Sequence, residues 1–283
     1  MKKTYDSIDL TKFIASILIL TMHCNALSDY EGVSIIPSFL SRWGVPFFFI
    51  CSAYFLFSKS GQADFRKVLS GYIRRIGILY LVWFVFNFPN VIYLRLYPKD
   101  LTSVRTWLYF LKNSVLSSTF TGSWYLASSI FSAWLVYILC RKLPTKTVLW
   151  ITSAFYFLCI LTSAYAGLLP AHVLNALTFL CFPLNIFHGA FYFAIGKYIC
   201  ENRKKILSGC GRIQAMTGFV VFYTLFAVEI FVTKRLGIFD SSNATLSTAL
   251  IAISMFLFCL QTDISISNGL LLRKLSTIIY CSQ

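Results

Sequence analysis

The hydrophobic positions of this chain fall into long runs, and the first run carries polar residues at helical spacing. Ile8–Leu27 is apolar except for a few positions that include Asp9, Lys12, Ser16 and His23. Asp9, Ser16 and His23 follow one another at intervals of seven, and Lys12 lies eleven positions before His23. At 3.6 residues per turn, Lys12 and His23 share one helix face with roughly 16 Å of rise between them. The segment is therefore predicted to be a helix with a polar stripe.

Further apolar runs approach the roughly 20 residues that a transmembrane helix needs. Together they predict an all-α polytopic membrane helix bundle with about eight or nine transmembrane segments. No linker or fixed repeat divides the chain, so residues 1–283 are predicted to form a single transmembrane domain. After the first run, the expected segments are Val45–Phe57 with the residues before it, Ile76–Tyr93, Trp124–Cys140, Val148–Leu168, Leu177–Cys200, Ala215–Val232, Leu246–Leu260 and a ninth that begins near Ile278.

Composition and charge indicate a lipid bilayer, and not nucleic acid, as the partner of this chain. The chain is 58% hydrophobic and only 12% charged, which excludes an ordinary soluble domain and predicts a lipid bilayer as its solvent. The net charge of +15 would suggest nucleic acid for a soluble protein, but here the bases gather in alternate loops. That pattern follows the positive-inside rule and predicts a cytoplasmic N-terminus with no nucleic-acid partner. The expected cytoplasmic bases are Lys2, Lys3, Lys59, Arg66, Lys67, Arg74, Arg75, Arg141, Lys142, Lys146, Arg203, Lys204, Lys205, Arg212, Arg273 and Lys274.

The ionisable residues inside the predicted spans are the candidates for chemistry. A charged group at the bilayer centre costs about 2.5–3.5 kcal/mol on insertion scales, which makes it a functional-site hypothesis. Lys12 has an equal alternative as an anchor whose ammonium reaches the inner headgroups. His172 and His188 are interpreted as packing residues. The nine cysteines show no CxxC spacing, so no metal site is predicted.

The second apolar segment supplies a motif. It reads Arg-Trp-Gly-Val-Pro-Phe-Phe-Phe-Ile-Cys-Ser-Ala-Tyr over 42–54 and follows Ile-Asp-Leu-Thr-Lys-Phe-Ile-Ala over 8–15 and His23. In this order the motifs resemble the membrane acyltransferase-3 family, multi-pass enzymes that O-acylate cell-surface carbohydrates. Later stretches resemble the same family, namely Tyr-Ile-Arg-Arg-Ile over 72–76, Gly-Ser-Trp-Tyr-Leu over 122–126, Phe-Tyr-Phe-Ala-Ile-Gly over 191–196 and Leu-Arg-Lys-Leu-Ser over 272–276 with Ile279 and Tyr280.

Several positions depart from the family pattern. Lys12 stands where the family has arginine, which keeps the charge but loses the planar fork that grips phosphate bidentately. Ser52 is followed by alanine instead of glycine, and only Arg75 of the pair Arg74 and Arg75 matches the family spacing. The family also continues into a further histidine-containing stretch beyond the motif that ends at Tyr280. The chain is therefore expected to lack the last helix or helices of the family.

The resemblance implies an integral-membrane O-acyltransferase of a bacterial cytoplasmic membrane. Its donor would be acyl-CoA, most simply acetyl-CoA, used as a substrate with no bound cofactor. Its acceptor would be a hydroxyl of an extracytoplasmic carbohydrate or related surface molecule. His23 is the expected catalytic base, because an unperturbed imidazole titrates near neutral pH. Lys12, Arg74 and Arg75 are expected to bind the phosphates of acyl-CoA. The expected supporting or substrate-binding residues are Asp9, Asn25, Arg42, Ser52, Trp124 and Glu229.

Two other functions fit the same residues. A small-molecule transporter also places charges inside its spans, although such proteins commonly show inverted repeats or broken helices, and none is evident here. A truncated, non-catalytic member of the acyltransferase family is the other alternative.

Overall fold

The structure is a computed structural model that describes residues 5–24, 35–61, 64–93, 101–116, 119–120, 122–180 and 184–282. Within these ranges the regular elements are helices and no strand occurs, which confirms the all-α prediction. In chain order they are α1 (Asp6–His23), α2 (Ile35–Ser41), α3 (Gly44–Phe57), α4 (Phe65–Phe86), α5 (Phe88–Val91), α6 (Val104–Leu116), α7 (Ser123–Lys142), α8 (Thr145–Leu161), the short 3-10 helix η2 (Ala166–Leu168), α9 (Ala171–Leu180), α10 (Leu184–Glu201), α11 (Arg203–Gly209), α12 (Arg212–Arg235), α13 (Leu246–Gln261) and α14 (Gly269–Cys281).

Helix α3 lies at the centre of the bundle. Nearly all of its side chains are buried, since it is apolar on every face and has no side that prefers water. It packs most extensively against α10, where a Cβ on Gly196 would lie 2.6 Å from the Ile50 carbonyl oxygen and 2.7 Å from the Ala53 Cβ. Glycine at 196 therefore lets the two backbones approach closely, as small residues do between membrane helices.

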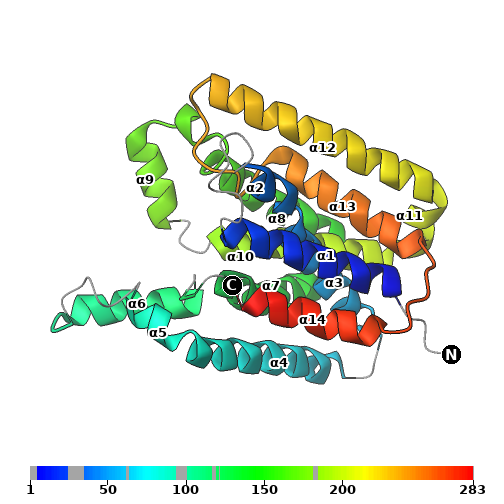
Figure 1. Cartoon of the computed structure of the whole chain (residues 1–283), viewed down its shortest axis with the longest axis horizontal. Coiled ribbons are helices and arrows are strands. Elements are labelled where there is room, and N and C mark those ends of the chain that lie inside the picture. Colours follow the sequence, from blue (N-terminus) through cyan, green and yellow to red (C-terminus); the bar gives the residue numbers. More distant parts are fainter. Residues whose placement is uncertain are drawn as a thin grey trace.

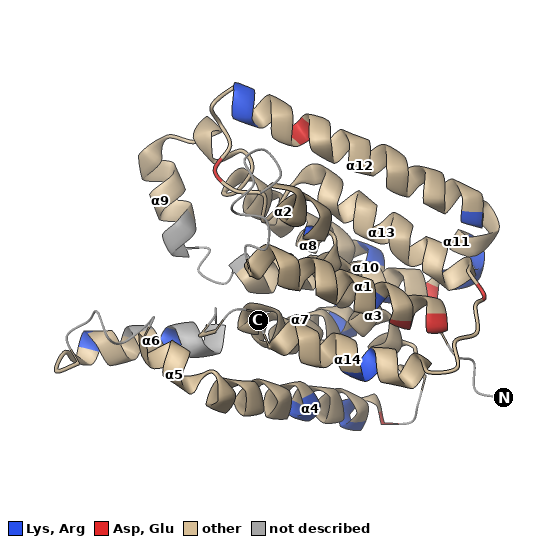
Figure 2. Ribbon diagram, in the orientation of Figure 1, with Lys and Arg blue, Asp and Glu red and all other residues tan. Residues whose placement is uncertain are grey.

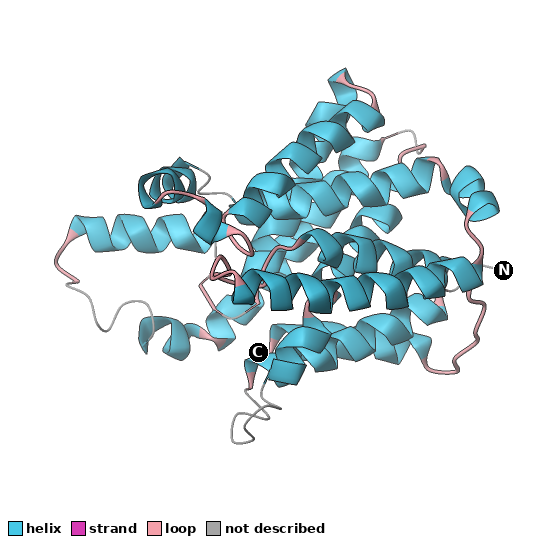
Figure 3. Cartoon of the chain, turned by 90° about the horizontal axis from the view of Figure 1, so that it is seen from above, coloured by secondary structure: helices cyan, strands magenta, loops and turns pink. Residues whose placement is uncertain are grey.

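The first and last helices lie side by side. Figure 1 shows α1 in blue against α14 in red, and the two helices share one of the largest contacts in the bundle. Helices α12 and α13 form a second close pair, while α10 also packs on α7 and α8. Figures 1 and 3 show α6 extending beyond the end of the bundle at which α1 ends.

Four helical segments in the described ranges are long and apolar enough to cross a membrane: Ile35–Phe57, Phe65–Phe86, Ser123–Lys142 and Arg212–Arg235. The protein is thus a membrane protein, but the predicted number of eight or nine spans is not reached by this criterion. Helices α8 and α13 are apolar and shorter, and α1 carries three charged residues. Each predicted segment nevertheless contains a helix.

Several predicted boundaries are wrong, and the starts of α4 and α14 differ most. Helix α4 begins at Phe65 and not near Ile76, because the Asp64 side chain caps its first turn by accepting the Lys67 backbone N–H at 3.3 Å. The bases that interrupt the apolar run remain exposed on this helix. The last segment begins at Gly269, well before Ile278, and its 13 residues form one continuous helix.

Candidate functional site

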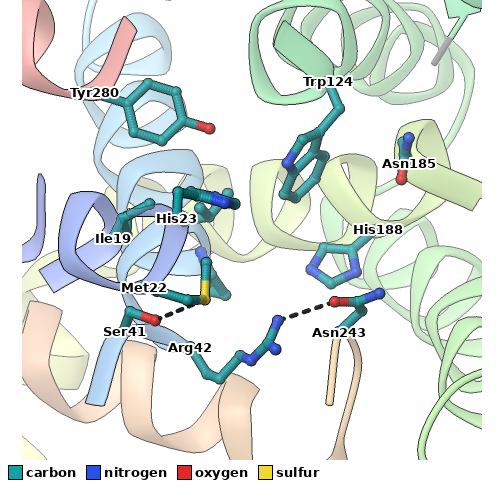
Figure 4. A pocket seen from close by; sticks show the side chains of 12 residues that line it. Ile19, Met22, His23, Ser41, Arg42, Trp124, Asn185, His188, Asn243 and Tyr280 are labelled. Carbon is teal, nitrogen blue, oxygen red and sulfur yellow. Dashed lines mark hydrogen bonds between the residues drawn. The ribbon is translucent and has the colours of Figure 1, made fainter. Parts of the chain in front are cut away.

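The His23 side chain lines a cavity of about 260 Å³ at one end of the bundle, which is called here the His23 cavity. His23 is the last residue of α1 and is exposed at the cavity. Side chains from six helices and two connecting segments line this space, and Figure 4 shows them converging on it. The lining residues are Ile19, Met22, His23, Ser41, Arg42, Val45, Pro46, Trp124, Asn185, His188, Asn243 and Tyr280.

Arg42 lies on the wall of this cavity and is held in place by two side chains. Its Nη1 donates to Asn243 Oδ1 at 2.9 Å, and its Nη2 donates to Ser38 Oγ at 2.9 Å. Its Nε is buried and has no hydrogen-bond partner among the described residues. Arg42, a supporting residue in the sequence prediction, thus lies in the same cavity as His23.

Trp124 and His188 line the side of the His23 cavity opposite His23 (Figure 4). Their rings meet edge to face with centroids 5.9 Å apart, and both side chains line the His23 cavity (Figure 4). Trp124 was expected at the site, whereas His188 was interpreted as a packing residue. The missed signal is the polar face of α10, on which Asn185 and His188 are three residues apart and Tyr192 follows four later.

Lys12 lines a second cavity, of about 170 Å³, called here the Lys12 cavity. The ammonium of Lys12 lies 5.8 Å from the centroid of the Phe55 ring, a distance suited to a cation–π contact. Ser52 lines the same cavity and hydrogen-bonds to the Tyr125 hydroxyl at 3.0 Å. Ser52, a supporting residue in the sequence prediction, therefore lies with Lys12 and does not line the His23 cavity.

Tyr280 lines both cavities. Its hydroxyl donates to the Gly122 carbonyl oxygen at 3.2 Å, and its ring packs edge to face on Phe48 and Tyr125. These contacts hold the ring between the space around Lys12 and the space around His23. The polar stripe of α1 thus contacts two cavities that meet at one side chain.

Asp9 has a structural partner that the sequence analysis did not assign. Its carboxylate accepts three hydrogen bonds from Arg273, Nε to Oδ1 at 3.0 Å, Nε to Oδ2 at 3.2 Å and Nη2 to Oδ2 at 2.7 Å. Asp6 accepts the Ile266 backbone N–H at 2.9 Å. Both acids therefore fasten α1 to α14 or to the segment before it, and neither lines either cavity.

Three of the remaining predicted residues lie apart from the cavities. Arg74 and Arg75 are exposed on α4, and neither lines the Lys12 cavity, although Ile76 and Leu79 of the same helix do. Glu229 accepts the backbone N–H groups of the first turn of α13 at 2.8 and 3.0 Å. A carboxylate is stabilising at a helix N-terminus, so Glu229 links α12 to α13.

Two predicted positions complete the comparison. Asn25 lies outside the described residues. His172, expected in a short outer loop, is exposed on α9 and lines neither cavity.

Comparison with known proteins identifies the family of this chain. The model of an acyltransferase domain, that of the acyltransferase-3 family, matches residues 5–283. The chain belongs to the acyltransferase-3 family. This confirms the resemblance drawn from the motifs around Lys12, His23 and Arg42.

Curated relatives carry a different kind of name. An "Amino-acid racemase" of Enterococcus faecalis is 26% identical over 249 residues, which are 84% of this chain and 33% of that protein. A "Serine/alanine racemase" of Enterococcus gallinarum is 25% identical over 167 residues, or 57% of this chain and 23% of that protein. The chain thus spans about a third or less of the relatives it matches. No solved structure matches.

Proposed function

We propose that this protein is an integral-membrane O-acyltransferase that moves an acyl group, most simply acetyl, from cytoplasmic acyl-CoA to a hydroxyl of an extracytoplasmic carbohydrate. The observation that carries the proposal is the arrangement along α1. Lys12 and His23 lie on one helix and line two cavities, and Tyr280 lines both of these cavities. A donor site and an acceptor site on opposite sides of one barrier are what transfer across a membrane requires.

The distribution of charge supports the direction of transfer. In Figure 2 basic residues lie at the end of the bundle that holds the N-terminus, where α4, α12 and α14 begin, and others lie at the opposite end, on α6 and in the last turn of α12. The positive-inside rule then puts this end in the cytoplasm of a bacterium, with the protein in the inner membrane. The Lys12 cavity is nearer this end, and the His23 cavity opens at the other. The donor side and the acceptor side follow from that orientation.

The chemistry assigned to the His23 cavity is direct general-base catalysis. The imidazole accepts the proton of the acceptor hydroxyl as its oxygen attacks the thioester carbonyl carbon. A C–O bond forms, the C–S bond breaks, and coenzyme A leaves as a thiolate that takes the proton from the imidazolium. The products are an O-acyl ester and the free thiol, and His23 returns to its neutral state. The Arg42 guanidinium on the wall of this cavity would stabilise the negative charge that develops on the carbonyl oxygen.

The donor is placed on the other side of Tyr280. The Lys12 ammonium would attract the phosphates of acyl-CoA, and the roughly 16 Å of helix between Lys12 and His23 is comparable to an extended pantetheine arm. Arg74 and Arg75 are exposed on α4, beside the residues of that helix that line the Lys12 cavity. They would contact the nucleotide part of the donor outside this cavity.

The experiment that tests this function uses the purified protein in nanodiscs with acetyl-CoA. Free coenzyme A thiol is measured with and without a panel of hydroxyl acceptors, namely methyl glucoside, N-acetylglucosamine and glycerol. We expect at least one acceptor to stimulate thiol release and to become acetylated, and we expect His23→Ala to abolish both signals. The absence of acceptor-stimulated release with all three would contradict the proposal.

A small-molecule transporter is the second candidate, because two cavities that share one lining residue also suit a permeation path. The relatives are named for racemases of amino acids, one of them of serine and alanine, which makes these amino acids the solutes to test. Uptake of labelled L-serine or L-alanine into proteoliposomes without acyl-CoA would favour transport. A non-catalytic family member would show neither uptake nor acetylation.

A further inference from the structure

His188 is a buried imidazole that faces the His23 cavity without a hydrogen bond. It is 7% exposed and lines the cavity from α10. No described residue donates a hydrogen bond to it or accepts one from it. Its immediate contacts are aromatic, with ring centroids at 5.9 Å for Trp124, 5.4 Å for Tyr156 and 5.2 Å for Tyr192. A neutral imidazole has one donor and one acceptor nitrogen, and a buried polar group of this kind is normally hydrogen-bonded.

The backbone beside His188 is fixed by close contact with α7. A Cβ on Gly189 would lie 2.3 Å from Ser128 Oγ and 2.5 Å from Ser132 Oγ, so only glycine allows this approach. Ser132 Oγ donates to the Ile186 carbonyl oxygen at 3.1 Å, and Ser128 Oγ donates to the Asn185 carbonyl oxygen. These contacts hold the first turns of α10, and they present His188 to the cavity in one orientation.

The side chains around His188 suit a small polyhydroxylated ligand. Figure 4 shows the Trp124 indole beside the imidazole, Asn185 on the same helix, and His23 on the other side of the space. An indole face packs against the apolar face of a sugar ring, while amide and imidazole groups bind its hydroxyls. The cavity of about 260 Å³ lies just below the usual range of about 300–1,000 Å³ for ligand pockets. That volume fits one sugar unit better than an oligosaccharide.

We propose that His188 binds the acyl acceptor, through a hydrogen bond to a hydroxyl neighbouring the one that His23 deprotonates, with the sugar ring packed on Trp124. This inference rests on the proposed acyltransferase function and deepens it by naming a specificity-determining residue. His188 touches the acceptor only, so the donor site around Lys12 is independent of it.

The test compares three variants with the same acetyl-CoA assay and methyl glucoside, N-acetylglucosamine and glycerol as probes. His188→Phe keeps an aromatic ring in the cluster and removes both nitrogens, whereas His188→Asn keeps a donor and an acceptor. We expect His188→Phe to raise the KM for a sugar probe about tenfold, in line with one lost hydrogen bond in a buried site, and to leave the KM for acetyl-CoA unchanged. His188→Asn should recover part of the loss. His172→Phe, on the exposed helix α9, is the matched control and should behave as the wild type.

The outcomes separate this inference from the proposed function. If the wild type uses a sugar probe and His188→Phe keeps the wild-type KM for it, the role of His188 is wrong while acyl transfer stands. If His188→Phe alters both KM values and His188→Asn gives no rescue, His188 is a packing residue and the inference is again contradicted. If no probe stimulates thiol release by the wild type, the proposed function fails, and the acceptor role fails with it.

Discussion

At the scale of single residues, the polar positions of α1 separate into two kinds according to what they contact. Asp9 forms an ion pair with Arg273 inside the protein, and Ser7 donates to the Cys259 carbonyl oxygen at 2.7 Å. Lys12 and His23 instead line cavities. Sevenfold spacing predicted the shared face correctly, but spacing cannot tell which side chains another helix will satisfy. That depends on α14, which is far away in the sequence.

His23→Ala is expected to abolish acyl transfer and leave the protein inserted and folded. Removing a general base costs about 10²–10⁴-fold in rate. The measurement is acceptor-dependent release of coenzyme A thiol, together with the melting temperature of the variant. His172→Ala is the control and should retain activity. Equal effects of the two substitutions would contradict the assignment of His23 as the general base.

Lys12→Ala is expected to weaken acetyl-CoA binding, and Lys12→Arg is expected to retain or strengthen it. A phosphate contact depends first on charge and then on the fork geometry that arginine adds. The apparent affinity for acetyl-CoA of purified variants in nanodiscs measures the effect. Unchanged affinity in Lys12→Ala would assign this lysine to anchoring and would move the donor site toward Arg74 and Arg75.

At the scale of elements, the ion pair between Asp9 and Arg273 is the clearest link between the two ends of the chain. The Asp9 side chain is 5% exposed, so losing its partner leaves a carboxylate in a poorly hydrated place, although the Arg273 side chain is 57% exposed and solvent compensates in part. Arg273→Ala should therefore destabilise the protein by about 1–3 kcal/mol. Lys274→Ala, exposed on the same helix, should have little effect. Thermal unfolding in detergent checks both, and equal melting temperatures would contradict this assignment.

The elements themselves were largely predictable, and their ends less so. Long apolar runs located helices α7, α12 and α13 because burial and lipid exposure both select apolar residues. Helix α4 starts earlier than its apolar run because a cap and exposed bases extend it into the polar region. The amphipathic helix α6 was not predicted, since its bases made the segment read as a loop.

At the scale of the whole molecule, Tyr280 lines both cavities, and we predict that its ring separates them. Replacing it with leucine should open a path between them, so that water reaches the thioester. Acetyl-CoA hydrolysis without acceptor should then rise while transfer to an acceptor falls. Tyr280→Phe keeps the ring and loses only the bond to the Gly122 carbonyl oxygen, so it should resemble the wild type. Unchanged hydrolysis in Tyr280→Leu would show that the ring is not the barrier.

Only part of the site was predictable at this scale. His23, Arg42 and Trp124 were identified from motifs, and the structure brings them to one cavity. His188 and Asn243 come from a span and a connecting segment, and no local pattern relates them to His23. Tyr280 belongs to a family motif, but the motif did not assign it to the site. Their convergence is a property of the packing of α10 and α14 around α3 and α1, which one sequence does not reveal.

The orientation of the bundle can be measured directly. A cysteine at Leu168 should react with a membrane-impermeant thiol reagent added to intact cells, and one at Lys204 should react only after permeabilisation. The background should lack Cys24, which is exposed. Reversed labelling would put the Lys12 cavity on the outside and overturn the assignment of the donor side.

The most direct test of transfer across the membrane places donor and acceptor on opposite sides of sealed vesicles. Acetyl-labelled coenzyme A is supplied on the N-terminal side and a sugar acceptor on the other, with His23→Ala vesicles as the control. We predict labelled ester on the acceptor side with the wild type only, and none when the two substrates exchange sides. Ester that forms only when both substrates share a side, or that forms equally with His23→Ala, would contradict the account.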